Sequence, residues 1–191
     1  VVYGYRGDGS EMGRRALPVE DARCMVNLAI PARSEKLLAP CAGAGGIVFA
    51  AKYISNDIDV YSVDVDPVVA PGLEFYGSRH STADSTKTRF PEAYFDSLVT
   101  EVPFSRNATR DIIKTVRNLK DSLKKDGRLV IMSSLDQAAV LKREIGDVGF
   151  YPYIIQKVNR KGTDVAIMGW IKSYDKYRKI EPLSNHVKSV Y

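Results

Sequence analysis

Short runs rich in Val, Ile and Leu alternate with amphipathic segments along most of the chain, and this order limits its fold more than any other feature. Alternation of this kind predicts a parallel sheet with helices on both faces. The last pattern, 150–172, consists of two long strands joined at 159–163 and predicts an antiparallel hairpin. We therefore expect an α/β protein whose mostly parallel, twisted sheet ends in an antiparallel hairpin. The predicted strands before the hairpin are 36–41, 59–67, 81–85, 95–104 and 128–134, and the predicted helices lie between Pro18 and Pro31 and over 46–54, 107–125 and 135–147.

Length and composition fit one folded domain with two flanking segments. The chain has 191 residues, of which 45% are hydrophobic and 27% are charged, and these proportions are usual for a globular protein. We expect an N-terminal arm over 1–17, a folded domain over 18–173 and a basic tail over 174–191. No apolar run approaches the ~20 residues of a membrane-spanning helix, so no membrane association is expected.

Few residues are available for disulfides or for metal binding. Two cysteines and two histidines occur in the whole chain, so we expect no disulfide framework, no metal site and a cytoplasmic location. The formal net charge of +5 favours a polyanionic partner such as RNA. Basic residues on the helix 107–125 are also typical of a solvated surface, and for this helix we favour that interpretation.

The sequence LLAPCAGAGG, residues 37–46, places three glycines directly after the first predicted strand. Sheets of this type bind ligands at the carboxyl ends of their strands, and a loop without side chains lets a ligand approach the backbone. A dinucleotide fingerprint requires glycine at position 48, where this chain has Val48. Asp64 ends the second strand 21 residues after Gly43, close to the ~20 expected of an acid that binds a ribose. A glycine-rich turn beside a solvated acid is the alternative, but the combination favours a nucleoside site such as that for S-adenosylmethionine.

Five segments stand in the order found in class I methyltransferases. They are LPVEDARCMVNLA, LLAPCAGAGGIVFAA, VYSVDVDP, ADSTKTRFP and FDSLVTEVPFS. Over roughly residues 14–172, the chain resembles the methyltransferase domain of the THUMP-linked tRNA guanine-N2 methyltransferases. This resemblance implies a Rossmann-like class I methyltransferase fold, an enzyme that uses S-adenosylmethionine as its cofactor, and RNA as its substrate.

The same resemblance implies a set of cofactor-binding residues. The glycine-rich loop would surround the methionine part of the cofactor. Asp64 would bind the ribose with Asp66 beside it, and Asp84 would contact the adenine amine. The complete predicted set is Pro40, Cys41, Ala42, Gly43, Gly45, Asp64, Asp66, Asp84 and Thr100.

The segment TEVPF, residues 100–104, falls on the family's catalytic tetrad, Asn/Asp-Pro-Pro-Tyr/Phe. In that tetrad, a side-chain oxygen and a backbone carbonyl accept hydrogen bonds from an exocyclic amino group, and the aromatic residue stacks on the base. The resemblance makes Glu101, Pro103 and Phe104 the catalytic residues. Glu101 stands in place of Asn or Asp and Val102 in place of the first proline, and a glutamate can accept the same hydrogen bond.

These residues predict a methyltransferase that acts on an exocyclic amino nitrogen of a nucleobase, with guanine in tRNA or another structured RNA as the expected substrate. The expected substrate-binding residues are Arg14, Arg15 and Arg106. No RNA-binding domain is visible in the sequence, so a protein partner that supplies RNA recognition is also expected. Two alternatives stay open: a cofactor-binding subunit of a partner complex with impaired catalysis, and a methyltransferase for DNA or a small molecule.

Overall fold

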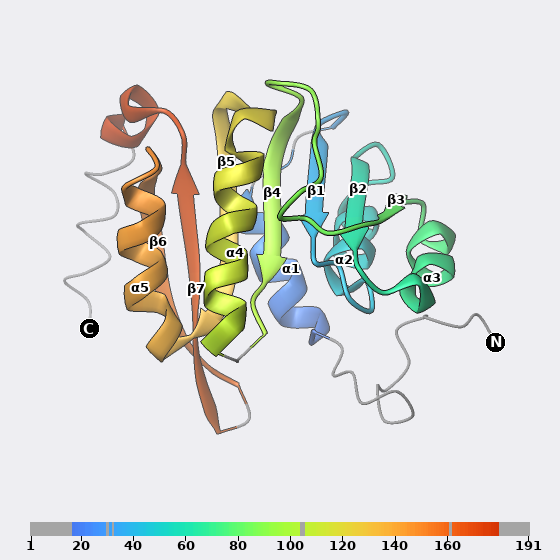
Figure 1. Ribbon diagram of the computed structural model, residues 1–191, viewed down its shortest axis with the longest axis horizontal. Helices are drawn as coiled ribbons and strands as arrows, with labels where there is room; N and C mark the ends of the chain where they lie inside the picture. Colours follow the sequence, from blue (N-terminus) through green and yellow to red (C-terminus); the bar gives the residue numbers. More distant parts are fainter. Residues whose placement is uncertain (1–16, 30, 32, 104–105, 161, 180–191) are drawn as a thin grey trace.

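The computed structural model describes residues 17–29, 31, 33–103, 106–160 and 162–179. Its centre is a seven-stranded sheet in the order β3-β2-β1-β4-β5-β7-β6 (Figure 1). Strands β1 to β5 are parallel, and β7 pairs antiparallel with both β5 and β6. The predicted fold class is therefore confirmed. The strands are β1 (Lys36–Pro40), β2 (Asp59–Asp64), β3 (Arg79–Thr82), β4 (Phe95–Glu101), β5 (Leu123–Ser134), β6 (Tyr151–Arg160) and β7 (Thr163–Ile171).

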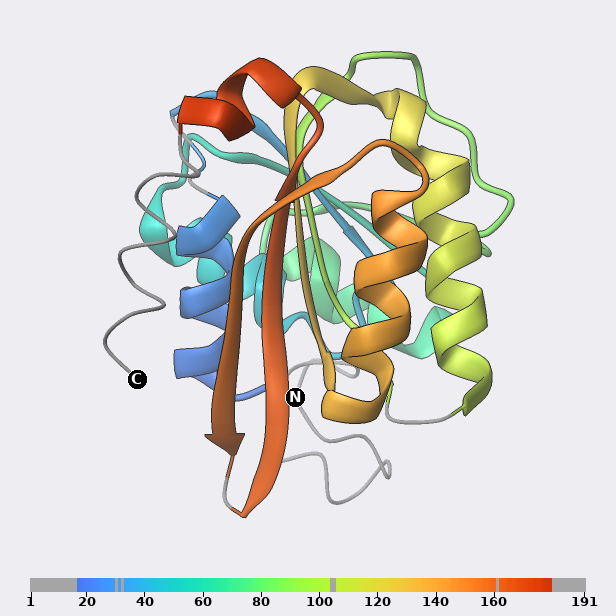
Figure 2. The same ribbon diagram turned by 90° about the vertical axis from the view of Figure 1, so that its left-hand side faces the viewer.

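Helices cover both faces of the sheet, as Figures 1 and 2 show. One hydrophobic core joins α1 (Val19–Ala29), α2 (Gly46–Ile54) and α3 (Ala70–Phe75) to one face, and a second joins α4 (Arg106–Leu119) and α5 (Leu135–Gly146) to the other. Strand β1 is buried on both sides, because Leu37 belongs to the first core and Leu38 to the second. Within the described ranges, no helix combines the length and the apolar character needed to cross a membrane.

Several elements differ from the prediction. Strand β2 ends at Asp64 rather than at 67, β3 is Arg79–Thr82 rather than 81–85, and β5 begins at Leu123 rather than at 128. The helix predicted over 107–125 ends at Leu119, a 3-10 turn η2 (Lys120–Ser122) follows, and Leu123 begins β5, where it pairs with Phe95. Leu123 continues the apolar spacing of the helix, but it is buried by the sheet. The helix α3 and the 3-10 turn η1 (Pro67–Val69) before it were not predicted, since Pro71 and Gly72 give this segment the composition of a loop.

The β6–β7 hairpin closes the sheet on one side, as Figure 2 shows. A register shift lies between Pro152 and Ile154, and the Tyr153 side chain reaches α1, where its hydroxyl donates to the Leu28 carbonyl at 2.6 Å. The Tyr153 ring crosses Gly169 so closely that a Cβ at this position would lie 2.5 Å from the ring atom Cζ. Glycine at 169 therefore allows the hairpin to be fixed to a helix as well as to β5.

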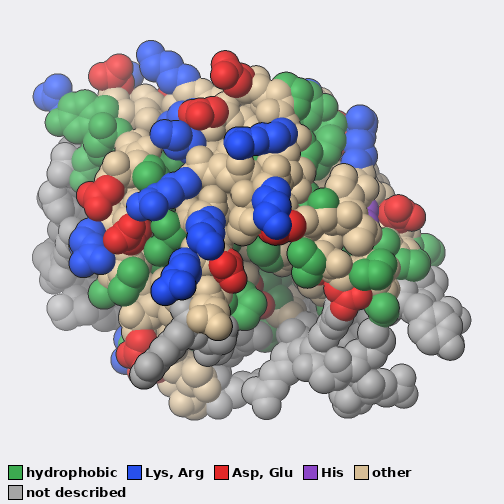
Figure 3. Space-filling model, in the orientation of Figure 1, with side chains coloured by type: hydrophobic (Ala, Val, Ile, Leu, Met, Phe, Trp, Pro, Cys, Tyr) green, Lys and Arg blue, Asp and Glu red, His purple; other side chains and the backbone are tan. Residues whose placement is uncertain are grey.

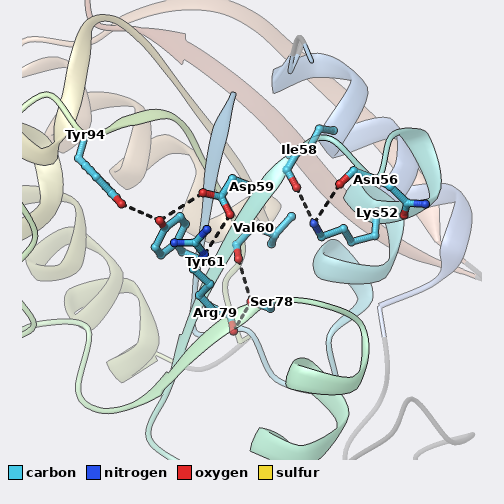
Figure 4. A network of polar contacts seen from close by, with 10 residues as sticks. Lys52, Asn56, Ile58, Asp59, Val60, Tyr61, Ser78, Arg79 and Tyr94 are labelled. Carbon is cyan, nitrogen blue, oxygen red and sulfur yellow. Dashed lines mark hydrogen bonds and ion pairs between the residues drawn. The ribbon is translucent and has the colours of Figure 1, made fainter. Parts of the chain in front are cut away.

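A polar network holds β2 at its amino end (Figure 4). The Arg79 guanidinium pairs with the Asp59 carboxylate at 3.2 Å, and the Tyr61 hydroxyl donates to the same carboxylate at 3.3 Å. From α2, the Lys52 ammonium donates to the Ile58 carbonyl at 2.7 Å. An ion pair near the surface, such as Arg79–Asp59, contributes little by itself. Together these contacts connect β2 with α2 and β3. The opposite end of β2 carries an acid of the predicted site.

The folded region extends slightly beyond the predicted boundaries. Leu17, which the prediction placed in the arm, is buried in the first core and packs against Gly46 at the start of α2. Residues 174–179, predicted as tail, are helical. The rest of the predicted arm and tail lies outside the described residues.

Candidate active site

The predicted cofactor-binding residues lie along one edge of the sheet. Pro40, Asp64 and Glu101 are the last residues of β1, β2 and β4, and β1 pairs with both of the other strands. Asp84 follows two residues after Thr82, the end of β3. Residues from four separate stretches of sequence therefore meet at the carboxyl ends of neighbouring parallel strands, where doubly wound sheets bind their ligands.

The glycine-rich loop is fastened to the end of β2. The Gly43 amide donates to Oδ2 of Asp64 at 2.7 Å, and the Ala42 amide donates to the Val63 carbonyl at 3.0 Å. Gly43 has a φ of 52°, and a Cβ there would meet no atom within 4 Å, so its backbone is open on that side. Gly45 has a φ of 82° and precedes α2. The glycines thus allow a left-handed loop whose backbone a ligand can reach.

Cys41 has a backbone conformation that is costly for its residue type. Its φ is 58°, in the left-handed region where a Cβ collides with the carbonyl. Although the residue is exposed, burial of the sulfur, opposed by a hydrogen bond from Ser85 and assisted by the negative charges of Asp64, Asp84 and Asp111, raises the pKa of the thiol to about 11. Cys41 is therefore protonated at neutral pH and is a poor nucleophile. The three carboxylates give the loop a negative field.

Replacing Cys41 with glycine should stabilise the protein. Glycine removes a left-handed strain of about 1–2 kcal/mol but increases the entropy of the unfolded chain, so the expected gain is about 0.5–1 kcal/mol. Thermal unfolding should show a midpoint higher by roughly 1–4 °C. Cys41→Ala is the matched control, because it removes the thiol and keeps the Cβ. Equal stability of Cys41→Gly and Cys41→Ala would show that the left-handed backbone at residue 41 stores no strain.

The Asp84 carboxylate is held in place by the loop that follows it. Oδ1 of Asp84 accepts hydrogen bonds from the Thr86 hydroxyl at 2.7 Å and from the Thr86 amide at 2.9 Å, and these bonds lower the pKa of Asp84. Asn118 of α4 supports the same loop, since its side chain donates to the Ser85 carbonyl at 3.1 Å and to the Thr88 carbonyl at 2.7 Å. Asp84 is therefore an ionised and oriented acceptor next to the glycine-rich loop.

The predicted tetrad begins where β4 leaves the sheet. The Thr100 hydroxyl is fully buried and donates to the Pro40 carbonyl at 2.7 Å. This hydroxyl therefore holds the end of β1 against the end of β4 and fixes the position of the glycine-rich loop relative to the tetrad segment. Glu101 follows and is half-buried, and its backbone pairs with Met132 of β5. The Glu101 backbone is thus fixed to β5, and the residue before it is fixed to β1.

Gln137 is a contact of the tetrad that sequence reasoning missed. Its side-chain amide donates to the Pro103 carbonyl at 3.0 Å, while its side-chain oxygen accepts from the Ser134 amide at 3.1 Å. Ser134 completes a capping box at the start of α5 by accepting from the Gln137 amide. The spacing Ser-x-x-Gln at 134–137 is a sequence signal for this cap, but it does not reveal the bond to Pro103. The turn after β4 is therefore anchored to the first turn of α5.

For several predicted site residues, the structure describes no contact that links them to the glycine-rich loop or to the tetrad segment. Asp66 accepts from the Val68 amide at 2.9 Å and caps η1. Phe104, Arg14 and Arg15 lie outside the described residues, and for Arg106 only the backbone is described. Asp111 of α4 was missed, because only the packing of α4 against the loop brings it near Cys41. The described part of the chain contains no group of three or more His, Cys, Asp or Glu side chains arranged to hold a metal ion.

The chain is similar to known proteins in its structure. No protein-family model matches the chain, and no curated protein matches it. TrmN from Thermus thermophilus is similar over 87% of this chain, with a TM-score of 0.74 and 22% identity. A 1,6-didemethyltoxoflavin-N1-methyltransferase from Burkholderia thailandensis, solved with S-adenosylhomocysteine, covers 87% of this chain with a TM-score of 0.62 and 18% identity. The chain has the class I methyltransferase fold.

Other methyltransferases of this fold extend the comparison. The N-methyltransferase NodS from Bradyrhizobium japonicum, solved in complex with S-adenosylhomocysteine, covers 80% of this chain with a TM-score of 0.61 and 14% identity. The match spans 85% of NodS and 83% of the Burkholderia enzyme. It spans 52% of TrmN, so the chain matches about half the length of that protein. The class I methyltransferase fold is thus shared with proteins of different sizes.

Proposed function

We propose that this chain is an S-adenosylmethionine-dependent methyltransferase that acts on an exocyclic amino nitrogen of a nucleobase, guanine in tRNA or another structured RNA. The observation that carries the proposal is the bond from the Gly43 amide to Asp64 at 2.7 Å, which fixes an acid beside an open glycine backbone at the carboxyl edge of a class I methyltransferase sheet. Two structures of this fold, the Burkholderia enzyme and NodS, contain S-adenosylhomocysteine.

The chemistry of the edge fits that cofactor. Each Asp64 oxygen accepts one backbone amide, from Gly43 or from Asp66, and a carboxylate oxygen can accept a second donor, such as a ribose hydroxyl. Asp84, whose Oδ1 accepts from Thr86, would accept from an adenine amino group. The negative field of Asp64, Asp84 and Asp111 around Cys41 would favour a positively charged sulfonium over its neutral product.

We assign the central chemical role to Glu101. When bound, S-adenosylmethionine supplies an electrophilic methyl group, and its neutral thioether is the leaving group. Glu101 would accept a hydrogen bond from the amino group and direct the nitrogen lone pair at the methyl carbon. It would then take the proton that the nitrogen loses once an N–C bond has replaced the S–C bond. Positioning of this kind can supply several kcal/mol of the barrier, and α5 supports it by holding Pro103 through Gln137.

RNA is the substrate that we favour. The net charge of +5 suits a polyanion, and the tetrad segment resembles that of enzymes that methylate guanine in tRNA. A protein partner would complete RNA recognition. A small heteroaromatic molecule is the second candidate, because the Burkholderia methyltransferase was solved with such a molecule and is matched over 83% of its length, against 52% for TrmN.

Two measurements test the proposed function. Titration calorimetry with S-adenosylhomocysteine should show binding, and lack of binding at millimolar ligand would overturn the methyltransferase assignment. Incubation with methyl-labelled S-adenosylmethionine and unmodified RNA, DNA or a small-molecule extract should then place the label in RNA, as a methylated amino group of guanosine after digestion. Label in the small-molecule fraction alone would support the second candidate. Cofactor binding without transfer to any fraction, even when cell extract is added as a source of partner, would indicate a subunit with impaired catalysis.

A further inference from the structure

A groove separates the two helices on the face of the sheet that Figure 3 presents. Its volume between α4 and α5 is about 710 Å³, and the two helices lie side by side in both ribbon views (Figures 1 and 2). Its lining includes the apolar side chains of Ile113 and Val140. Three cations, Arg110, Lys114 and Arg117, line its α4 side. They are four and three residues apart, so they form one row along the helix.

Two of these cations differ from the third because no ion pair with a described residue is found for them. The structure gives Arg110 and Lys114 no hydrogen bond or ion pair among the described residues, and both side chains are exposed. Arg117 instead pairs with Glu144 of α5 at 2.9 Å. Figure 3 shows several Lys and Arg side chains over the region of α4 and α5, with Asp and Glu side chains among them. In the sequence alone, this row is indistinguishable from a solvated helix face, whereas the structure gives it a concave setting.

The carboxylates of the groove leave it positive. Glu144 accepts from Arg117 at 2.9 Å and from Arg143 at 3.1 Å, so two arginines offset its single charge. Asp136 also lines the groove, in the first turn of α5, where the positive end of the helix macrodipole stabilises an acid. Three cations and two carboxylates line the groove, so its lining is positive by one charge. Arg110 and Lys114 supply the positive charge that a ligand would meet, and Asp136 offsets part of it.

One end of the groove lies next to the proposed active site. Ser134 and Gln137 line it, and the Gln137 side chain donates to the Pro103 carbonyl in the tetrad segment at 3.0 Å. Helix α4 begins at Arg106, directly after the same segment. An RNA strand whose target base enters the active site at the end of β4 can thus continue along the groove and stay in contact with the protein surface.

We propose that the α4–α5 groove binds the phosphate backbone of the RNA next to the base that is methylated. This inference rests on the proposed function and adds to it the surface that holds the substrate strand. Arg110 and Lys114 contact successive phosphates, and Ile113 and Val140 contact the sugars between them. Backbone contacts of this type position a nucleic acid without reading its sequence.

The test compares two charge-matched double variants by fluorescence anisotropy with an unmodified, labelled tRNA transcript. Arg110→Gln/Lys114→Gln should raise the RNA dissociation constant about 10-fold. It should also reduce the slope of log affinity against log salt by about 1.4, since each lost phosphate contact on a single strand removes about 0.7. Arg33→Gln/Lys125→Gln removes the same charge from exposed positions at the amino ends of β1 and β5. It should change both quantities little. Circular dichroism and S-adenosylhomocysteine calorimetry should show both variants folded and able to bind the cofactor.

The outcomes separate this inference from the proposed function. Equal loss of RNA affinity in both double variants would mean that the groove cations bind RNA no better than other surface cations. That result would overturn this inference and leave the methyltransferase proposal intact. Cofactor binding without RNA binding by the wild type at low salt would also overturn it. If polyglutamate competes with the RNA as strongly as an equal concentration of unlabelled RNA, the groove takes acidic chains in general, and the assignment to an RNA backbone is wrong. Failure to bind the cofactor would overturn the proposed function itself.

Discussion

Replacing Glu101 with alanine should slow methyl transfer at least ~100-fold and leave the affinity for S-adenosylhomocysteine nearly unchanged. The carboxylate stands at the end of β4, beside the ends of β1 and β5, where our proposal has it accept from the substrate amino group. Alanine removes that acceptor and leaves the Gly43–Asp64 contact on β2 as it is. Single-turnover transfer to the labelled substrate measures the rate, and calorimetry measures the cofactor affinity.

Two further variants define what Glu101 contributes. Glu101→Gln keeps an acceptor oxygen but cannot take a proton, so it should lose less activity than Glu101→Ala if positioning dominates, and as much if proton transfer dominates. Glu92→Ala, exposed in the loop before β4, is the matched control and should retain full activity. An active preparation in which Glu101→Ala loses nothing would show that other residues hold the methyl acceptor.

Replacing Asp64 with alanine should raise the dissociation constant for S-adenosylhomocysteine at least ~100-fold. Hydrogen bonds to a charged acceptor contribute about 1.5–3 kcal/mol each, and the substitution removes both the expected bonds to the ribose and the acceptor for the Gly43 amide. The loop should therefore lose its position as well as its ligand contact. Calorimetry at a series of cofactor concentrations measures the effect.

Two further variants, Asp64→Asn and Asp57→Ala, serve as controls for the effect of Asp64→Ala. Asp64→Asn keeps one acceptor oxygen and should bind more tightly than the alanine variant but more weakly than the wild type. Asp57→Ala removes an exposed carboxylate in the loop before β2 and should bind like the wild type. Cofactor affinity unaffected by Asp64→Ala would remove the glycine-rich loop and its acid from the binding site, whatever the substrate is.

The sequence predicted those parts of the fold that depend on local patterns. The helix at 46–54 follows a glycine turn, and the last two strands flank a short polar loop; in both cases neighbouring residues carry the signal. The helix at 107–125 was predicted too long because Leu123 satisfies two patterns, the helix spacing after Leu119 and the buried start of β5. Only the pairing of Leu123 with Phe95 decides between them, and that contact depends on the assembled sheet.

The same distinction holds for the candidate site. Asp64 was predicted as a site residue because it ends a buried strand 21 residues after Gly43. The structure adds a bond from the Gly43 amide to Asp64, which the spacing alone did not predict. The role of Gln137 at Pro103 and the position of Asp111 near Cys41 depend on how α5 and α4 pack on the sheet. A residue whose role is set by the packing of a helix leaves little trace in its own neighbourhood of the sequence.

The place of β7 has a consequence for how the chain is made. Among the described strands β7 is the last in sequence, yet it lies between β5 and β6. A ribosome that adds about 5–20 residues per second therefore completes β5 roughly 2–7 seconds before its neighbour exists. During that interval the edge of β5 is open, and unpaired strand edges join other chains readily. Among the described strands, β6 pairs only with β7, so it cannot cover β5 by itself. Protection of the β5 edge from aggregation therefore depends on completing the last strand of the sheet.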